Sequence, residues 1–450
     1  MGFRLAVRAR VLAGILVCLA GFSGLAGAAQ AATLTAGAGR ADIGIVPSLF
    51  PVEEFSIQHD PLAVRAILLD DGKTRVGLLV VDQTSISESM ITQLKSILQQ
   101  VAGVLPQNAL ICASHTFSAP HAFLRPDMPA AQRAGAEAYV KAIEVAARQA
   151  VTGARQSLSP ARIGVGQGRS RIGVNREVPT PGGWWLGANE AGFADPVFGV
   201  IRIDGADGHP KAVLMNAAVQ PALLDASTLA AGGRAISADL AGAASRHVET
   251  HYGNGVVAAY LVGAAGDQVP YFQARRFVAT ADGNMEAVDL HEAAFPLLDL
   301  FGDRLGSAVE RVTDSIQSSP AAELAVLRQT IEVPVQAGAR GLPTGPVKTY
   351  AYTPADTAQV PVVVVRIGDT ALVGLQAELS ATLGAQIRAA SPFSHTLVMT
   401  LVDGAAKYMP DETAYPRFTY TARSSRYAQG AGETTVHAIA GMLQSLQARQ

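Results

Sequence analysis

Four side chains that can bind a cation or move a proton each follow an apolar run of the sequence: His115, Asp267, Glu378 and Tyr408. Imidazole, carboxylate and phenol groups coordinate metals and act as general acids and bases. Each of them also has a structural explanation, because a histidine at a strand end is often only hydrogen-bonded and a glutamate that opens a helix is favoured by the helix dipole. The residue types therefore indicate a candidate polar site, and the elements that carry them decide whether they meet.

Those elements form a pattern that occurs three times, at 63–115, 198–267 and 360–408: a hairpin with its turn at Asp and Gly, a helix, and an apolar strand. The pattern predicts a mixed-sheet α/β fold in one large domain built from repeated units. Strand ends that meet at one edge are where open α/β sheets place their chemistry, so we expect the four side chains to share a site, with Asp82 and Gln220 behind them. The expected elements are the hairpins 63–82, 198–220 and 360–378, the helices 86–104, 240–252 and 380–390, and the strands 109–114, 256–263 and 395–402.

Two segments show no clear periodicity and are predicted to be loops, 175–195 and 336–356. The first contains both tryptophans of the chain, Trp184 and Trp185, among glycines and prolines. Such a pair can form the wall of a substrate cleft, although capping a core is the commoner role.

The other motifs are weaker evidence for a functional site. His247 and His251 lie four apart on an expected helix, a spacing that can hold a metal, but the polar face around them favours exposure to solvent. His291 and Glu292 imitate the zinc-protease helix without its second histidine. After residue 31, the chain has no Gly-x-Ser-x-Gly elbow, Walker loop or Cys-x-x-Cys pair, which argues against serine-elbow, nucleotide and thiol chemistry.

The N-terminus has the features of a signal peptide. Arginines precede the apolar run 11–20, and small residues end at an Ala-Gln-Ala sequence at 29–31. We therefore expect a signal peptide of 1–31 and a mature domain of 32–450 in the periplasm or outside the cell. The mature chain would contain one cysteine, Cys112, and no run long enough to span a bilayer.

Composition excludes little. The formal net charge of the whole chain is −2 and its basic and acidic residues are interspersed, which argues against nucleic-acid binding. The hydrophobic content of 49% owes much to alanine and to the N-terminal segment, and does not indicate a membrane protein.

Five short blocks stand out in order along the chain: ICASHTFSAPHAF at 111–123, GVNREVP at 173–179, GAAGDQVP at 263–270, VGLQAELSATLGAQIR at 373–388 and DGAAKYMP at 403–410. Together they resemble blocks of the neutral/alkaline non-lysosomal ceramidases. The resemblance implies the catalytic N-terminal fold of that family, with a bound zinc ion. We expect no room for the family's C-terminal immunoglobulin-like domain, because the sequence stops soon after the third unit.

The chain departs from the family at the implied metal site. His115 matches the first histidine of the family's His-x-His pair, whereas Phe117 replaces the second and Gln220 stands where another zinc histidine is expected. Glu378 and Tyr408 match the family's remaining ligands. The resemblance thus implies a site of His115, Glu378, Tyr408 and Gln220 that holds zinc weakly, holds another divalent metal, or holds none.

The resemblance also implies an activity, the hydrolysis of an amide in an N-acylsphingosine or a related acyl amide. In this scheme Asp267 or Glu378 moves protons, and Arg176 with Asn175 holds the polar head of the substrate. Water is the nucleophile, since Val269 replaces the family's serine. Walls of an apolar cleft would come from Trp184, Trp185 and Phe123, and His121 is near enough in sequence to replace a missing ligand.

Two alternatives remain open. The chain is either such an enzyme, making at most transient contact with a membrane surface, or a catalytically inactive relative that binds a lipid or glycan head group. A third possibility, a secreted scaffold, is favoured if the polar strand-end residues do not converge.

Overall fold

The computed structural model describes residues 34–124, 127–253, 255–280, 285–320, 322–337 and 341–448. Contacts between residues group 32–450 into one compact unit. The predicted signal peptide, 1–31, lies outside the described residues.

The three expected units are confirmed, each as an antiparallel hairpin, a helix and a strand that pairs in parallel with the second hairpin strand. The first unit is β3 (Ala63–Asp70), β4 (Arg75–Val81), α1 (Glu88–Ala102) and β5 (Ala109–Ala113). The second is β9 (Val197–Gly205), β10 (Pro210–Ala217), α3 (Asp239–Tyr252) and β12 (Val257–Val262). The third is β17 (Pro354–Ile367), β18 (Thr370–Leu375), α5 (Ala381–Ala390) and β20 (His395–Met399).

Local chemistry explains why these units form. In the first hairpin, Gly72 has a φ of 84°, a conformation that glycine adopts without a steric penalty, and its N–H donates to Asp70 Oδ1 at 2.8 Å. The Ser87 side chain caps α1 by accepting from the N–H of Met90, and Gly103 ends the helix in the left-handed conformation. The strand that follows, β5, is buried at every position, which matches its continuous apolar sequence.

The remaining elements extend these units into two large sheets and four small ones. An eight-stranded sheet has the order β12-β10-β9-β6-β1-β3-β4-β5, and a four-stranded sheet the order β16-β17-β18-β20. The strands not yet named are β1 (Thr35–Asp42), β2 (Phe55–Gln58), β6 (Ser159–Arg169), β7 (Gly173–Thr180), β8 (Gly183–Asn189), β11 (Arg234–Ile236), β13 (Gln268–Pro270), β14 (Arg275–Ala279), β15 (Met285–Asp289), β16 (Leu324–Gln336), β19 (Glu378–Leu379) and β21 (Tyr408–Met409). The other helices are α2 (Ala130–Gln156), α4 (Phe295–Ser315), α6 (Tyr420–Ser424) and α7 (Ala431–Gln447), with 3₁₀ turns at Pro47–Leu49, Pro106–Asn108, His291–Ala294 and Glu412–Ala414.

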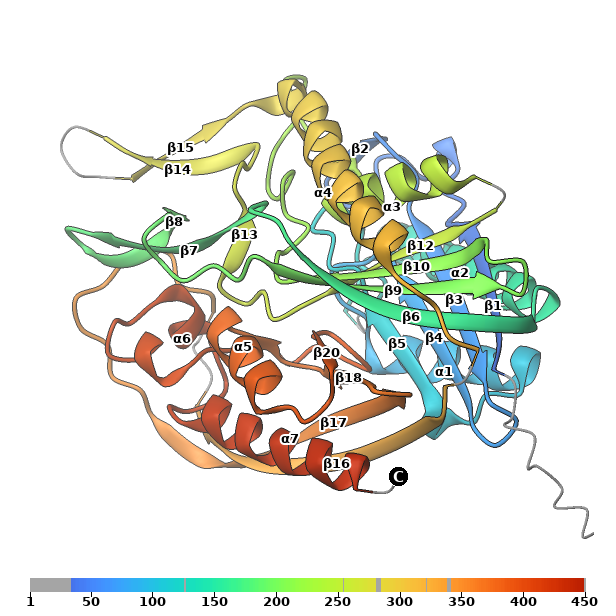
Figure 1. Cartoon of the computed structure of the whole chain (residues 1–450). Coiled ribbons are helices and arrows are strands. Elements are labelled where there is room, and N and C mark those ends of the chain that lie inside the picture. The colour runs from blue at the N-terminus through green and yellow to red at the C-terminus, as the bar shows by residue number, and fades with distance from the viewer. Residues whose placement is uncertain are drawn as a thin grey trace, which may run out of the picture. The chain divides into compact units, whose positions relative to one another are not determined.

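All three units share one apolar core. One cluster of buried side chains takes residues from the strands of every unit, among them Leu78, Leu214 and Val365. The opposite faces of the sheets pack on helices: α1, α2, α3 and α4 cover the eight-stranded sheet, and α5 and α7 cover the four-stranded sheet (Figure 1). This shared core holds the ends of strands from all three units around one region.

One predicted loop is wrong. Most of segment 175–195 belongs to β7 and β8, which form an antiparallel hairpin. On its other side, β7 pairs with β13. The turn needs only the residues between the two strands, where Pro181 and Gly182 lie, and the tryptophans that follow favour strand structure. The second predicted loop is shorter than expected, because β16 extends to Gln336 and β17 begins at Pro354.

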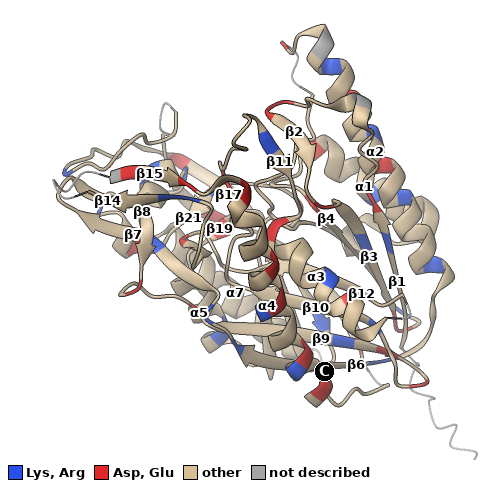
Figure 2. Ribbon diagram, turned by 90° about the horizontal axis from the view of Figure 1, so that it is seen from above, with Lys and Arg blue, Asp and Glu red and all other residues tan. Residues whose placement is uncertain are grey.

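Charges of both signs are interspersed over the fold, with no continuous basic stripe on the described elements (Figure 2). Within the described ranges, no helix is both long and apolar enough to cross a membrane.

Candidate functional site

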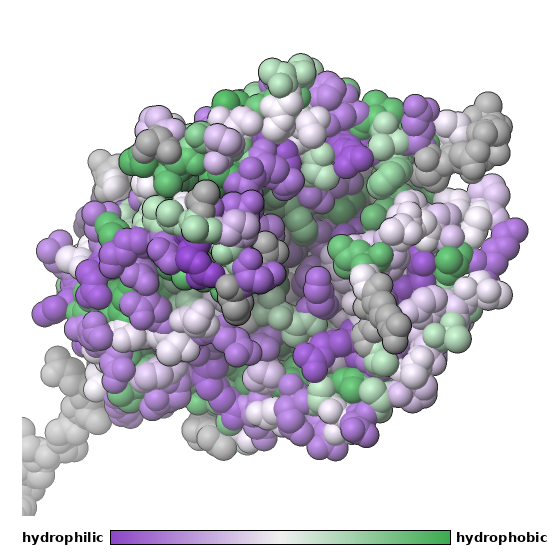
Figure 3. All heavy atoms as spheres, turned by 180° about the vertical axis from the view of Figure 1, so that it is seen from behind, coloured by the Kyte–Doolittle hydropathy of each residue, from purple (hydrophilic) through white to green (hydrophobic). Residues whose placement is uncertain are grey.

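The ends of strands from all three units meet as expected. His115 follows β5, Gln220 follows β10, and Glu378 opens β19 directly after the strand β18. Glu378 is the register partner of Tyr408 in the parallel pair of β19 and β21. His115, Glu378 and Tyr408 line one cavity of about 370 Å³, on a molecule whose surface is hollowed on the face opposite to the view of Figure 1 (Figure 3).

His115 is held rigidly in an uncommon conformation. Its φ is 69°, and its backbone N–H donates to the carbonyl oxygen of Gln83 at 2.9 Å. Such left-handed residues are often found at functional sites, where the surrounding structure holds them. The ring is fixed as well, with Nδ1 2.6 Å from the carbonyl oxygen of Thr84.

This fixed ring sets the chemistry of the other nitrogen. Because a carbonyl only accepts, Nδ1 of His115 must carry a proton, and Nε2 lies 3.1 Å from Oε2 of Glu378. In neutral imidazole, Nε2 would then turn a lone pair toward a carboxylate oxygen. The arrangement is favourable only when a cation, either a proton or a metal ion, lies between the two atoms. Carbonyl-fixed histidine with a free Nε2 is the usual state of a metal ligand.

The residues present fit a divalent metal with three donors: His115 Nε2, the Glu378 carboxylate and the Tyr408 phenol oxygen. Within the described ranges, no group of three or more His, Cys, Asp or Glu side chains is placed to hold a metal, so the candidate site depends on the tyrosine as its third donor. Burial raises the pKa of Tyr408 well above its usual range, and the Arg176 cation opposes that rise. A metal ion would therefore have to displace a tightly held phenol proton.

Gln220 turns its amide N–H toward Glu378, and an N–H group cannot serve as a fourth metal ligand. Its Nε2 donates to the carbonyl oxygen of Ala265 at 2.9 Å and lies 3.4 Å from Glu378 Oε2, while its Oε1 accepts from Arg176 Nη1 at 3.4 Å. Rotating the amide by half a turn would place two carbonyl oxygens together. Gln220 therefore offers an N–H to the Glu378 carboxylate.

Arg176 lies behind the aromatic wall of the cavity. Its guanidinium lies 4.7 Å from the ring centroid of Tyr408 and 5.5 Å from that of Tyr420. Among the described residues, its Nε and Nη2 have no hydrogen-bond partner. A buried cation with so few partners raises the positive potential around Tyr408.

Asp267 and Asn175 form a supporting layer that does not line the cavity. Asp267 Oδ1 accepts from the N–H of Ala381, the first residue of α5, at 2.8 Å, and Oδ2 accepts from Asn175 Nδ2 at 3.0 Å. Both carboxylate oxygens are thus occupied, and burial raises the pKa of Asp267 to about 6. The Gly-rich turn before Asp267 lets two backbones approach, since a Cβ on Gly266 would lie 2.5 Å from the carbonyl oxygen of Glu378.

Glu177, beside this layer, predicts a pH dependence of stability. Burial, and then the charge of Asp267, raise its pKa from 4.5 to about 7, and Thr421 donates a hydrogen bond to it. The folded state then binds this proton more tightly than the unfolded state, so stability falls as pH rises from about 4.5 to about 7. We expect Glu177→Gln to reduce this fall by up to about 3 kcal/mol, measured by urea unfolding at both ends of the range. An unchanged slope would contradict the assignment.

Asp82, expected behind the site, is part of a buried ion pair. Its Oδ2 accepts from Arg65 Nη1 and from the N–H of Ala63, both at 2.9 Å, and the two charged side chains are 1% and 2% exposed. Asp82→Ala should lower the free energy of unfolding by about 3 to 5 kcal/mol, because it leaves a buried guanidinium with only Glu249 nearby. Urea unfolding of this variant beside the double variant Arg65→Leu/Asp82→Leu tests this. The double variant should lose less stability.

The expected cleft residues are divided by the fold. Trp185 is buried against Phe277 and Tyr420, whereas Trp184 packs on Arg417. Neither tryptophan lines a described cavity near Glu378. Phe123 lines a larger cavity, and His121 stands between both cavities, paired with Glu53.

Several cavity residues have no signal in the sequence. The residues Thr84, Asp225, Arg234, Lys407 and Tyr420 all line the cavity, but they lie in irregular segments, at the start of the short strand β11 or in the short helix α6, without a recognisable motif. Burial raises the pKa of Asp225, and the Arg234 cation opposes the rise. Only the tertiary structure places these groups beside His115.

His247 packs against α4, whereas His251 is exposed, as the polar face predicted. His247 Nδ1 lies 2.7 Å from Asp303 Oδ1 and Nε2 lies 3.0 Å from Glu310 Oε1, and His251 Nδ1 lies 3.6 Å from the same Glu310 oxygen. These ion pairs give both histidines a structural role in joining α3 to α4.

Comparisons with known proteins agree with this geometry at the level of the fold. No family model matches the sequence, and no curated protein matches it. A solved structure described as a ceramidase complexed with C2 has a TM-score of 0.71 and 18% identity, covering 93% of this chain and 76% of that chain. The neutral ceramidase from Pseudomonas aeruginosa has a TM-score of 0.70 and 19% identity, covering 93% of this chain and 75% of that chain. The chain therefore has the fold of neutral ceramidases, as the five sequence blocks implied.

Proposed function

We propose that this chain is a divergent member of the neutral ceramidase family that hydrolyses the amide bond of an N-acylsphingosine or a related acyl amide. The observation that carries the proposal is the pair of His115 Nε2 and Glu378 Oε2, 3.1 Å apart, with Tyr408 in register on the adjacent strand. The fold of the two solved ceramidases supports the same substrate class.

A divalent metal, with zinc as the proposed ion, would be held by His115, Glu378 and Tyr408. When bound, it would polarise an amide carbonyl and lower the pKa of a water molecule. The Thr84 carbonyl keeps His115 Nε2 free for this role. Gln220 orients Glu378 through its amide N–H.

The remaining chemistry is proton transfer at Oε1 of Glu378, the carboxylate oxygen that does not face His115 Nε2. It accepts a proton from the attacking water as the new C–O bond forms, and returns it to the leaving nitrogen as the C–N bond breaks, which yields a carboxylic acid and an amine. We assign this role to Glu378 because both carboxylate oxygens of Asp267 are occupied in the supporting layer. Arg176 and Asn175 act by positioning Tyr408 and Asp267.

The second candidate function is binding of a lipid or glycan head group without hydrolysis. The orientation of Gln220 favours it, because an N–H replaces a metal ligand next to Glu378. In either case, the predicted signal peptide supports action in the periplasm or outside the cell.

An assay of hydrolysis separates the two. The purified mature protein, with and without added zinc, is incubated with N-acylsphingosines in mixed micelles, and the released sphingoid base is measured by chromatography. Zinc-dependent release supports the enzyme. Binding of the same amides without release, at every zinc concentration, supports the binding protein.

A further inference from the structure

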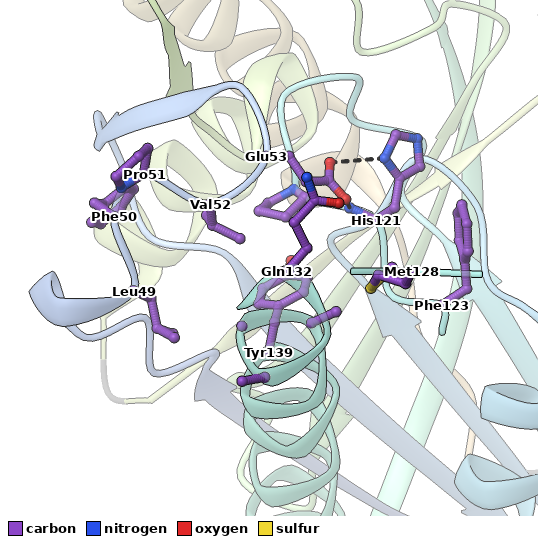
Figure 4. Close-up of a pocket in the computed structure, with 14 residues that line it drawn as sticks. Leu49, Phe50, Pro51, Val52, Glu53, His121, Phe123, Met128, Gln132 and Tyr139 are labelled. Carbon is purple, nitrogen blue, oxygen red and sulfur yellow. Dashed lines mark hydrogen bonds and ion pairs between the residues drawn. The ribbon is translucent and has the colours of Figure 1, made fainter. Parts of the chain in front are cut away.

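A second cavity, of about 940 Å³, lies next to the polar one. It is formed by residues 49–53, by Pro120, His121, Phe123 and Met128, and by the first turns of α2; its polar lining residues are Glu53, His121, Gln132 and Tyr139 (Figure 4). The other lining groups are apolar, including Phe50, Val52, Phe123 and Met128. The volume and lining are those of a site for an apolar ligand.

The two cavities share one wall. His121 lines both of them, and its Nδ1 lies 2.9 Å from Glu53 Oε2 (Figure 4), so this ion pair belongs to the wall that the two cavities share. Hydrogen bonds also link Tyr139 in the larger cavity to His115 in the smaller one, since Gln83 donates to the Tyr139 hydroxyl through its side chain and accepts from the N–H of His115 through its carbonyl oxygen.

We propose that the larger cavity holds the N-acyl chain of the amide whose carbonyl lies at Glu378, an inference that rests on the proposed function. Most polar groups of the lining already have partners, because the Glu53 carboxylate is paired with His121 and the Tyr139 hydroxyl accepts a hydrogen bond from Gln83, while Gln132 lies exposed on α2. An alkyl chain would therefore leave no buried charge without a partner.

Gly135 offers a direct way to fill the cavity. It lines the cavity from α2, and a Cβ placed on it would meet no atom within 4 Å. Replacing a glycine inside a helix also favours the helix, so Gly135→Trp should fold. Gly441→Trp is the matched control, because Gly441 lies exposed on α7 and its Cβ would also meet open space.

The experiment measures binding of acetyl, hexanoyl and dodecanoyl amides of one amino alcohol by calorimetry, on metal-free protein so that no turnover is needed. In the natural chain, affinity should rise with chain length by up to about fourfold per buried methylene. Gly135→Trp should remove the gain for the dodecanoyl amide while the acetyl amide binds as before, and Gly441→Trp should change neither. Gln132→Trp, on the same helix face, serves if Gly135→Trp does not fold.

The outcomes separate this inference from the proposed function. If Gly135→Trp removes the dependence of binding on chain length, the assignment of the cavity to the acyl chain is supported. If the metal-loaded protein nevertheless hydrolyses no amide, the proposed hydrolase is contradicted. Two results overturn the acyl-chain assignment. One is that the protein hydrolyses the amides but binds them with an affinity that is independent of acyl-chain length. The other is that the gain in affinity with chain length persists in both Gly135→Trp and Gln132→Trp. Dodecanoate, tested alone, shows whether the cavity takes the free acid as well as the amide. If it binds and dodecanoyl amide does not, the assignment to the substrate is wrong.

Discussion

Replacement of Glu378 by alanine is expected to remove the divalent metal from protein purified without chelators and to abolish amide hydrolysis. Glu378 is 8% exposed, faces His115 Nε2 and is in register with Tyr408, so its loss removes the carboxylate that contacts His115. Loss of groups that only support metal ligands lowers metal affinity 10 to 100-fold, and loss of a ligand should lower it at least about as much.

Elemental analysis of both proteins is the measurement, with Glu332→Ala as the control because Glu332 is an exposed carboxylate on β16. The natural chain and the control should each contain about one zinc or other divalent ion, and the Glu378 variant should contain none. If the natural chain binds no metal even after incubation with zinc, the hydrolase is contradicted and a binding protein on this fold remains.

Restoring two histidines should have the opposite effect. Phe117 lines the cavity with its ring centroid 4.6 Å from that of His115, and Gln220 reaches Glu378 from the other strand end. The double variant Phe117→His/Gln220→His should bind zinc at least about 10 to 100-fold more tightly and hydrolyse N-acylsphingosine faster, because imidazole is a stronger zinc ligand than an amide.

Competition with a zinc-binding dye measures that affinity, and the single variants show which position contributes. Phe117→Gln/Gln220→Leu is the matched control, since it changes both positions without adding imidazole. Equal affinity in the histidine variant and the natural chain would show that His115, Glu378 and Tyr408 do not form a metal centre.

The repeated units were predictable because their determinants are local. Glycines at the turns, the Ser87 cap and continuous apolar strands act over a few residues, so they can be recognised without knowledge of the fold. The segment around Trp184 was predicted wrongly because the contacts that determine its structure are not local. Its glycines and prolines indicate a loop, yet pairing with β13, far along the chain, fixes it as a hairpin.

The sequence by itself determined four of the residues that meet at the site, because His115, Gln220, Glu378 and Tyr408 each follow a strand whose end could be located. Their roles were decided by contacts across hundreds of residues. His115 and Glu378 are 263 positions apart, and Gln220 is oriented by the carbonyl oxygen of Ala265, 45 positions away, and by Glu378, 158 positions away. No local pattern encodes such contacts.

The larger cavity is the clearest case of a feature that local sequence patterns do not predict. Its walls come from irregular segments and one face of α2, none of which has a motif. Strands carry their own periodicity, so the sequence determined the framework and its chemical groups. Cavities and hydrogen-bond directions arise only where distant segments pack, so the tertiary structure alone decided which groups face the ligand and which support the fold.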